Sequence, residues 1–218
     1  NAVFTSQIQV ASGGPHEFLH SFGGPPKHEG VVFHGCEKPL HLLYTLDLSD
    51  PRVPVRLPGI RWLPLYYAFT YNASPIYYRI ASDRQVVIVH QEETRWTEGF
   101  PYSDFPDAFP FRWAQVSELM PLEDVIKAAD GEALWKEMLE EDAQAGIEND
   151  SNDLIALASG LPQGAPKTEC INPECEKQTM NVLAVVYHDE VDGVSFWGQS
   201  GDGEGIQIVY EICPRCAM

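Results

Sequence analysis

Two pairs of cysteines toward the C-terminal end constrain the fold of this chain more than any other feature of its sequence. Cys213 and Cys216 are separated by two residues, and Cys170 and Cys175 by four. A short loop of this kind presents two sulfur atoms to one metal ion, and two such loops supply the tetrahedral thiolate set of structural zinc sites. We therefore expect these four cysteines to bind one structural Zn²⁺ ion, with no position left open for catalysis.

Two disulfides or four unligated thiols are the alternatives to a metal site. The chain has five cysteines, so a fully disulfide-bonded protein would leave one over. It shows neither a signal-like apolar stretch at its start nor an apolar run of about 20 residues, so we expect a cytoplasmic protein with reduced cysteines and no membrane contact. Cys36 has only His34 and His41 nearby, and we expect a buried free thiol there rather than a second metal site.

Short apolar and aromatic runs, separated by turn residues, predict a mainly β fold. The chain contains 17 glycines and 17 prolines, which favour many turns over a helical bundle. The expected strands cover residues 4–10, 40–48, 63–71, 76–80, 86–90, 180–187, 194–197 and 205–213. We expect the strands between 40 and 90 to form an antiparallel sheet, and the last three to form a zinc-clipped β-meander.

A helical insert is expected between the two β-rich parts, which makes the fold class α+β. Apolar residues recur roughly at helical spacing over 121–143. We therefore divide the chain into an N-terminal β half (3–120), a helical and acidic connector (121–159) and a C-terminal zinc-binding β half (160–218). The two halves are expected to pack as a single domain.

The two halves also share an order of motifs. In the first, a Gly-Gly-Pro turn at 23–25 precedes Cys-Glu-Lys at 36–38 and two expected strands. In the second, Gly-Leu-Pro at 160–162 precedes Cys-Glu-Lys at 175–177 and again two expected strands. This order predicts two related antiparallel halves in one pseudo-symmetric domain. Chance recurrence of common turn residues is the alternative.

Acidic side chains dominate the charge of the chain. The 32 acidic and 14 basic residues give a formal net charge of −18. Such a charge repels nucleic-acid phosphates and anionic membranes, so direct nucleic-acid binding is not expected. It attracts basic proteins, and a basic protein partner is therefore the interaction that the composition favours, although acidic surfaces also serve solubility alone.

One segment matches a metalloprotease motif. His16, Glu17 and His20 fit H-E-x-x-H, in which two histidines on one helix bind zinc and the glutamate acts as general base. The extended form of the motif needs a third histidine at position 26, which is a proline here, and flanking glycines and prolines leave room for about two helical turns. We expect a surface turn, and a zinc metallohydrolase is the alternative.

Aromatic residues are concentrated in the expected strands between 63 and 80. They are Tyr66, Tyr67, Phe69, Tyr71, Tyr77 and Tyr78. Because they alternate only partly, some side chains must face away from the core, and a groove that binds a small ligand is a second alternative function.

Three segments, 23–25, 39–48 and 63–69, resemble bacterial YwqG-like proteins. They match the Gly-Gly-x-Pro turn, the Pro-Leu-x-Phe-Leu strand motif and the following aromatic strand of that family. The Trp-Gly at 197–198 and the glycines and strand of 203–210 resemble the family's second strand pair. Paired cysteines around this strand are also similar to the C-terminal part of the programmed cell death protein 2 family.

The resemblance implies a function as well as a fold. Members of the programmed cell death protein 2 family are implied to act as dedicated chaperones for a ribosomal protein, which is a basic client. The chain departs from both patterns, because Thr45 stands where YwqG-like proteins usually have glutamine and the first half has a single cysteine. We expect a zinc-stabilised, non-enzymatic, protein-binding module of the client-chaperone or toxin-immunity type.

Overall fold

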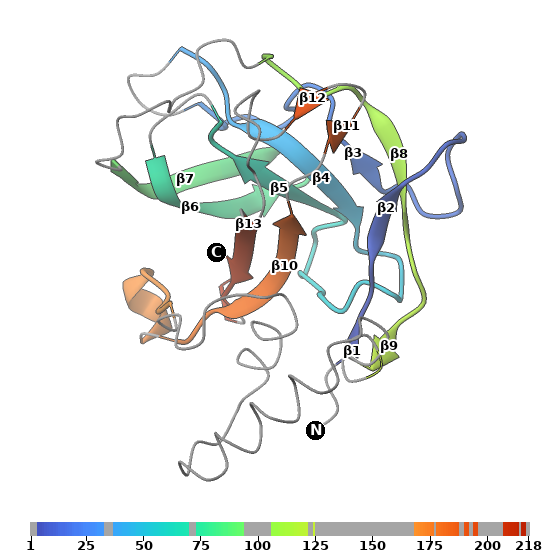
Figure 1. The fold of residues 1–218 in the computed structure, drawn as a ribbon. Coiled ribbons are helices and arrows are strands. Elements are labelled where there is room, and N and C mark those ends of the chain that lie inside the picture. The colour runs from blue at the N-terminus through green and yellow to red at the C-terminus, as the bar shows by residue number, and fades with distance from the viewer. Residues whose placement is uncertain are drawn as a thin grey trace, which may run out of the picture.

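The computed structural model describes residues 4–32, 37–69, 73–93, 106–121, 124, 168–176, 178–187, 190–191, 194–195, 207–213 and 215–216. Over these residues the chain is mainly β, with antiparallel sheets (Figure 1). The described part contains no helix that is long and apolar enough to cross a membrane. Most of the predicted helical insert at 121–143 lies outside the described residues, and Pro121 itself belongs to a short strand.

A five-stranded antiparallel sheet forms the centre of the molecule. Its strand order is β2 (Ile8–Val10), β8 (Arg112–Val116), β3 (Ser21–Phe22), β4 (His41–Asp47) and β5 (Trp62–Tyr67). All but one of the seven residues of β4 are buried, as expected for an apolar strand with neighbours on both sides. The strands predicted at 40–48 and 63–71 are therefore confirmed, whereas β3 and β8 were not predicted.

Four further strand pairs surround this sheet. They are β6 (Ala73–Ser82) with β7 (Gln85–Glu93), β10 (Asn181–Tyr187) with β13 (Gln207–Ile212), β11 (Glu190–Val191) with β12 (Val194–Ser195), and β1 (Phe4–Thr5) with β9 (Met120–Pro121). The predicted C-terminal meander is wrong in its pairing. β10 pairs directly with β13, and the β11–β12 hairpin lies between them in the sequence, because the apolar faces of β10 and β13 are both buried in the core.

The β4–β5 and β10–β13 pairs have the same register. In each, a seven-residue strand pairs with a six-residue strand. In each, the third residue of the longer strand is a bulge without a register partner, Leu43 in β4 and Leu183 in β10. A β-bulge is a specific feature of a strand pair rather than a random irregularity. The two strand pairs thus have a bulge at the same position, and the predicted pseudo-symmetry of the two halves stays a prediction.

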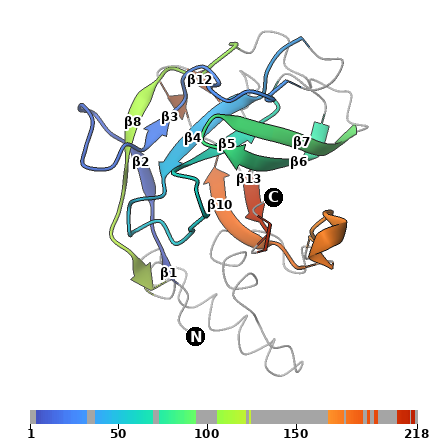
Figure 2. The ribbon, with the colours of Figure 1, turned by 180° about the vertical axis from the view of Figure 1, so that it is seen from behind.

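A single hydrophobic core joins the two ends of the chain. Val186, Ile208 and Tyr210 of the β10–β13 pair are buried in the same cluster as Leu63 and Leu65 of β5. Both ribbon views show β10 and β13 beside β5 and β6 (Figures 1 and 2). The C-terminal strands are therefore packed on the N-terminal half.

Asp47, at the end of β4, organises a buried polar network. Its fully buried carboxylate accepts hydrogen bonds from the backbone N–H groups of Leu19 and Ser49, from the Ser49 hydroxyl, and from the guanidinium of Arg61 at 2.9 Å. Burial alone would raise the pKa of Asp47, but these hydrogen bonds outweigh it and lower the pKa well below its usual value. The network ties the loop before β3 to the β4–β5 connection.

Replacement of Asp47 by alanine should destabilise the fold by about 2–4 kcal/mol, because several buried donors lose their acceptor at once. Urea denaturation measures the free energy of unfolding. Asp107→Ala is the matched control, since Asp107 is exposed and its ion-pair partner among the described residues is Lys38 at the surface, where such a pair contributes about 0–1 kcal/mol. Equal effects of the two substitutions would contradict the role given to Asp47.

Acidification should weaken the fold in two steps. Burial lowers the pKa values of His28 and His41, so below pH 6.5 the unfolded chain binds protons that the folded chain does not, and stability falls. The lowered pKa values of Asp47 and Asp50 add a second loss below about pH 4. Denaturation curves between pH 7.5 and 5 should be less pH-dependent for His41→Gln than for the native chain, and an unchanged slope would contradict the first step.

Candidate metal centre

Residues 168–170 and 178–180 lie side by side as the two arms of a small hairpin, and Cys170 lies on the first arm. The backbone N–H of Met180 donates to the carbonyl of Thr168, and that of Cys170 donates to the carbonyl of Gln178, each at 2.8 Å. These two hydrogen bonds fix the position of the Cys170 backbone in the hairpin.

A single turn of 3-10 helix, η1 (Pro173–Cys175), places the second sulfur atom. Asn172 caps this turn, since its side-chain oxygen accepts the backbone N–H of Glu174 at 3.1 Å. Glu176 then adopts a left-handed conformation, with a φ of 50°, and reverses the chain. The residues between the cysteines thus have a defined turn geometry, as their asparagine and proline favour.

The other two cysteines follow strand β13. Cys213 comes directly after Ile212 and is almost fully buried, whereas Cys216 is half-buried in the turn that follows. Arg215 lies 3.8 Å from Glu176 across the two loops. Both side chains of this ion pair are largely exposed, so it contributes little stability. The β10–β13 pairing is what brings the two cysteine loops to the same place.

The structure brings all four predicted cysteines together. Their sulfur atoms lie within 4.8 Å of one another, with Cys170 3.6 Å from Cys216 and Cys175 3.8 Å from Cys213. A tetrahedron with zinc–sulfur bonds of about 2.3 Å has sulfur–sulfur edges of about 3.8 Å, whereas a disulfide bond is about 2.05 Å. The cysteines are free thiols at the spacing of a four-coordinate metal site.

The surroundings of Cys170, Cys175 and Cys213 shift the pKa values of these three thiols. Burial raises the pKa of Cys170, and the neighbouring thiol of Cys216, followed by burial, raises the pKa of Cys175. Burial also opposes ionisation of Cys213, but backbone N–H groups of Arg215 and Cys216 outweigh it and lower the pKa of Cys213 to about 7. Four thiolates can coexist at this spacing only when a cation compensates their repulsion, and the cluster can therefore hold a metal ion.

Two side chains that were not predicted complete the surroundings of the cluster. Met180 is buried with the cysteines, and Tyr77 of β6 packs against the same cluster. Tyr77 comes from the N-terminal half, so a side chain from outside the two cysteine loops also contacts the metal centre. Strand alternation alone does not show which face of β6 meets the cysteines, and sequence reasoning had no signal for this contact.

The H-E-x-x-H segment is not a metal site. His16 and His20 do not lie on a helix. The imidazole of His20 is almost fully buried, with Nε2 2.8 Å from the Asp50 carboxylate and Nδ1 accepting the backbone N–H of Asp47. Because both ring nitrogens have partners, His20 is not available to a metal. His16 and Glu17 are exposed, as expected of a surface segment, but His20 is a buried structural residue of the Asp47 network.

The fifth cysteine cannot be placed relative to the cluster, because Cys36 and His34 lie outside the described residues. His41, the other histidine close to Cys36 in sequence, is buried, and its Nε2–H donates to the carbonyl of Pro106 at 2.7 Å. The expectation of a free thiol at Cys36 stays a prediction.

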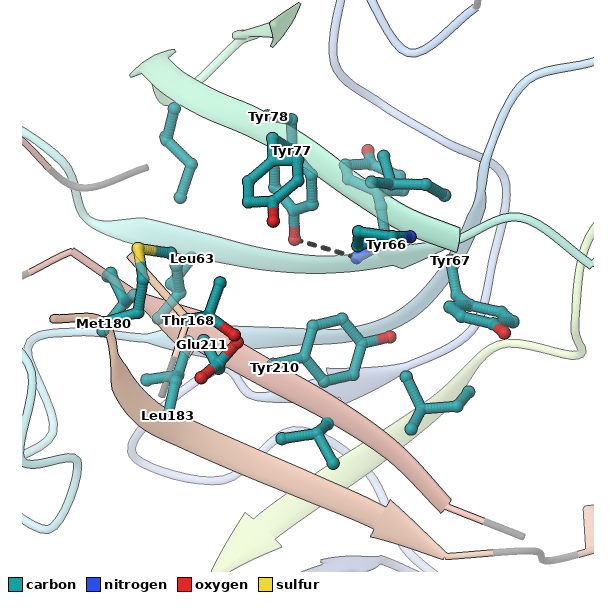
Figure 3. Close-up of a pocket in the computed structure, with 16 residues that line it drawn as sticks. Leu63, Tyr66, Tyr67, Tyr77, Tyr78, Thr168, Met180, Leu183, Tyr210 and Glu211 are labelled. Atoms are coloured by element: carbon teal, nitrogen blue, oxygen red, sulfur yellow. Dashed lines mark hydrogen bonds between the residues drawn. The ribbon is translucent and has the colours of Figure 1, made fainter. Parts of the chain in front are cut away.

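The aromatic residues of the proposed groove lie mainly at the contact between the two halves. Tyr66, Tyr67, Tyr77 and Tyr78 line a cavity of about 330 Å³ between β5, β6 and the β10–β13 pair, and Tyr210 lies across it (Figure 3). The other two predicted residues do not line this cavity among the described residues: Phe69 is buried in the core, and Tyr71 is not described.

The hydroxyl groups in this cavity are partly used by the protein itself. Tyr78 donates to the carbonyl of Pro64 at 2.9 Å and accepts the backbone N–H of Tyr66 at 3.2 Å. The buried hydroxyl of Tyr210 has no hydrogen-bond partner within the described part of the chain. The cavity is thus lined by apolar side chains together with polar groups from Thr168, Glu211 and the tyrosines.

Comparison of the chain with protein-family models, with curated proteins and with solved structures found no match.

Removal of the metal ligands should destabilise the C-terminal strands first. In Cys213→Ser, or after addition of a strong chelator, amide hydrogen exchange in β10 and β13 should accelerate by on the order of tenfold or more, while β4 and β5 change less. Exchange measured by mass spectrometry resolves these segments. Cys36→Ser is the matched control and should leave the exchange of β10 and β13 unchanged. An equal response of all strands, or no response, would contradict a local metal clip.

Proposed function

We propose that this chain is a zinc-stabilised, non-enzymatic module that binds a basic protein partner. The observation that carries the zinc assignment is the set of four cysteine sulfur atoms within 4.8 Å of one another. A tetrahedral set of four thiolates is typical of Zn²⁺, whereas Mg²⁺ and Ca²⁺ take oxygen ligands. The reducing cytoplasm, which keeps such thiols free, is the compartment that suits this site.

The zinc ion would have a structural role. Four protein ligands leave no coordination position for water, so the ion cannot activate a nucleophile. The metallohydrolase alternative loses its support because both nitrogens of His20 already have partners. What the ion would stabilise is the pairing of β10 with β13, since one cysteine pair precedes β10 and the other follows β13.

The charge of the chain supports a basic partner. A net charge of −18 accelerates the encounter with a basic surface and disfavours an acidic one. The resemblance to the programmed cell death protein 2 family makes a client chaperone the first form of this proposal, and an immunity protein for a basic toxin is its variant. Both forms share the same chemistry, namely an acidic surface that covers a cationic one.

We also infer that the β4–β5 and β10–β13 pairs descend from one repeated unit. The support is their common register with a bulge at the third residue of the longer strand. Leu46 and Val186, which occupy equivalent positions after the bulge, are both buried in the shared core. In this interpretation the metal ligands surround only the second copy.

Metal analysis of the purified protein separates the module from the enzyme alternative. The native chain should contain one zinc per molecule, Cys213→Ser with Cys216→Ser should contain none, and His16→Ala with Glu17→Gln should retain one. A second zinc that disappears in the His16→Ala, Glu17→Gln protein would overturn the non-enzymatic proposal.

The partner proposal has a separate test in its salt dependence. A protein captured from host extract should be basic, and its affinity for the chain, measured with both purified proteins, should fall at least about tenfold between 50 and 500 mM salt. An acidic partner, or an affinity that does not change with salt, would contradict electrostatic recognition and leave the zinc assignment intact.

A further inference from the structure

A hollow of about 460 Å³ lies over one face of the central sheet, away from the metal centre. The described residues around it come from β3, β4, β5 and β8, and from the segments 27–29 and 83–84. We define this feature as the tryptophan slot, because Trp62 and Trp113 line it from two strands that are not neighbours.

The floor of the slot follows from the strand register. Ser21 is paired with Trp113 of β8 on one side and with Thr45 of β4 on the other, so the three side chains point to the same face. Trp62 of β5 is paired with Asp47, two residues after Thr45, and therefore shares this face. Two small hydroxyl side chains thus lie between two indoles.

The spacing of the strands sets the width of the slot. Because β8 and β5 are three strand spacings apart, the backbones that carry the two tryptophans are about 14 Å apart. The bulge at Leu43 turns Leu42 onto the same face as Thr45, where it adds an apolar contact to the floor. The gap is wide enough for a ring that lies on the floor between the indoles.

The aromatic walls are held in place by their neighbours. Phe111 packs edge-on against Trp113, with ring centroids 5.0 Å apart and planes at 82°. The guanidinium of Arg61 lies 4.5 Å from the centroid of the Trp62 ring. Such contacts restrict the side-chain rotamers, so the walls are arranged before any ligand arrives.

The loop that closes one side is also fixed. Glu29 donates its backbone N–H to Arg84 and accepts the backbone N–H of Val86, at 2.8 and 3.0 Å. Gly30 has a φ of 82°, and a side chain at this position would approach the Val86 carbonyl to 2.1 Å. The segments 27–29 and 83–84 therefore form one connected wall.

Three polar groups at the slot have no hydrogen-bond partner among the described residues. The hydroxyls of Ser21 and Thr45 make no hydrogen bond among the described residues, although Ser21 has an exposed fraction of only 6%. His28, with an exposed fraction of 7%, leaves Nε2 without a partner. A buried polar group without a partner costs about 1–3 kcal/mol, so Nε2 of His28 favours a polar ligand over an apolar one, and the hydroxyls of Ser21 and Thr45 are two further groups that such a ligand can bond.

The hydrogen bonds of His28 indicate what Nε2 offers. Nδ1 lies 2.8 Å from the Tyr66 hydroxyl, and both groups are buried. The proton of the neutral imidazole is on Nε2 when the Tyr66 hydroxyl donates to Nδ1, and on Nδ1 when that hydroxyl accepts. Burial lowers the pKa of His28 and keeps the ring neutral at pH 7. Nε2 therefore donates to a ligand oxygen in one tautomer and accepts a ligand hydroxyl in the other.

The charges around the slot balance. Lys27 and Arg84 are matched by Glu29 and Asp83, so the local field favours neither an anion nor a cation. The net charge of −18 further disfavours phosphorylated ligands. A neutral molecule is therefore the ligand class that neither the local charges nor the net charge disfavours.

We propose that the tryptophan slot binds a neutral saccharide of one or two rings, with the C–H face of a sugar ring against Trp62 or Trp113. Its hydroxyls would bond to Ser21, Thr45 and His28, which together offer both donors and acceptors. A nucleobase can also stack on one indole face, so it is the competing ligand class for this slot. This inference is independent of the zinc module and of its protein partner.

The test is calorimetric titration of the full-length, zinc-loaded protein with glucose, galactose, N-acetylglucosamine, maltose and cellobiose, and with adenosine as the competing class. At least one saccharide should bind with a Kd below about 10 mM. Thr45→Val, which keeps the shape and removes the hydroxyl, should weaken that binding about threefold to tenfold, and Trp113→Ala at least about tenfold. Thr179→Val, at an exposed position outside the slot, is the matched control and should have no effect.

Tryptophan fluorescence adds a site-specific measurement. The saccharide that binds should change the emission of the native chain, and this change should shrink in Trp62→Phe and Trp113→Phe, whose melting temperatures report that they are folded. The proposal is overturned by a panel in which no saccharide binds, by adenosine binding in place of the sugars, or by saccharide binding that Thr45→Val and Trp113→Ala leave unchanged.

Discussion

Burial of one face of the β10–β13 pair against the central sheet is the contact on which the rest of the structure depends. An isolated two-stranded ribbon is marginal in water, and Val186, Ile208 and Tyr210 overcome this by entering the core beside Leu63 and Leu65. That packing holds the ends of β10 and β13 together, and the cysteine loops extend from those ends. The metal ligands are therefore gathered by the core, and a bound ion would lock an arrangement that packing already favours.

The limits of sequence reasoning follow from the range of the interactions involved. The apolar strands at 40–48 and 63–71 could be predicted because their pattern is local. β3 was missed because it has only two residues, and β8 because half-buried and exposed residues interrupt its apolar pattern. The prediction of a meander was wrong because the sequence of a strand does not specify which strand it pairs with. Here the pairing was decided by the burial of β10 and β13 in one core.

The candidate sites differ in the same way. The cysteine cluster was predictable, because each pair lies on one short turn whose spacing matches a metal site. The H-E-x-x-H segment matches the sequence motif, but a sequence motif does not show which side chains are buried. Here both ring nitrogens of His20 are hydrogen-bonded, one to Asp50 and the other to Asp47. The tryptophan slot has no local signature, since the groups that define it come from separate strands and meet only through the register.

Charge and shape would act at different distances in this protein. The net charge of −18 acts over the Debye length, about 8 Å at physiological salt, and selects the sign of whatever approaches. Within the slot the charges of Lys27 and Arg84 are balanced by Glu29 and Asp83, and selection there depends on hydrogen bonds and aromatic contact alone. A basic protein and a neutral ligand therefore need not compete, because the first would be recognised by the field of the whole surface, and the second carries no charge on which that field could act.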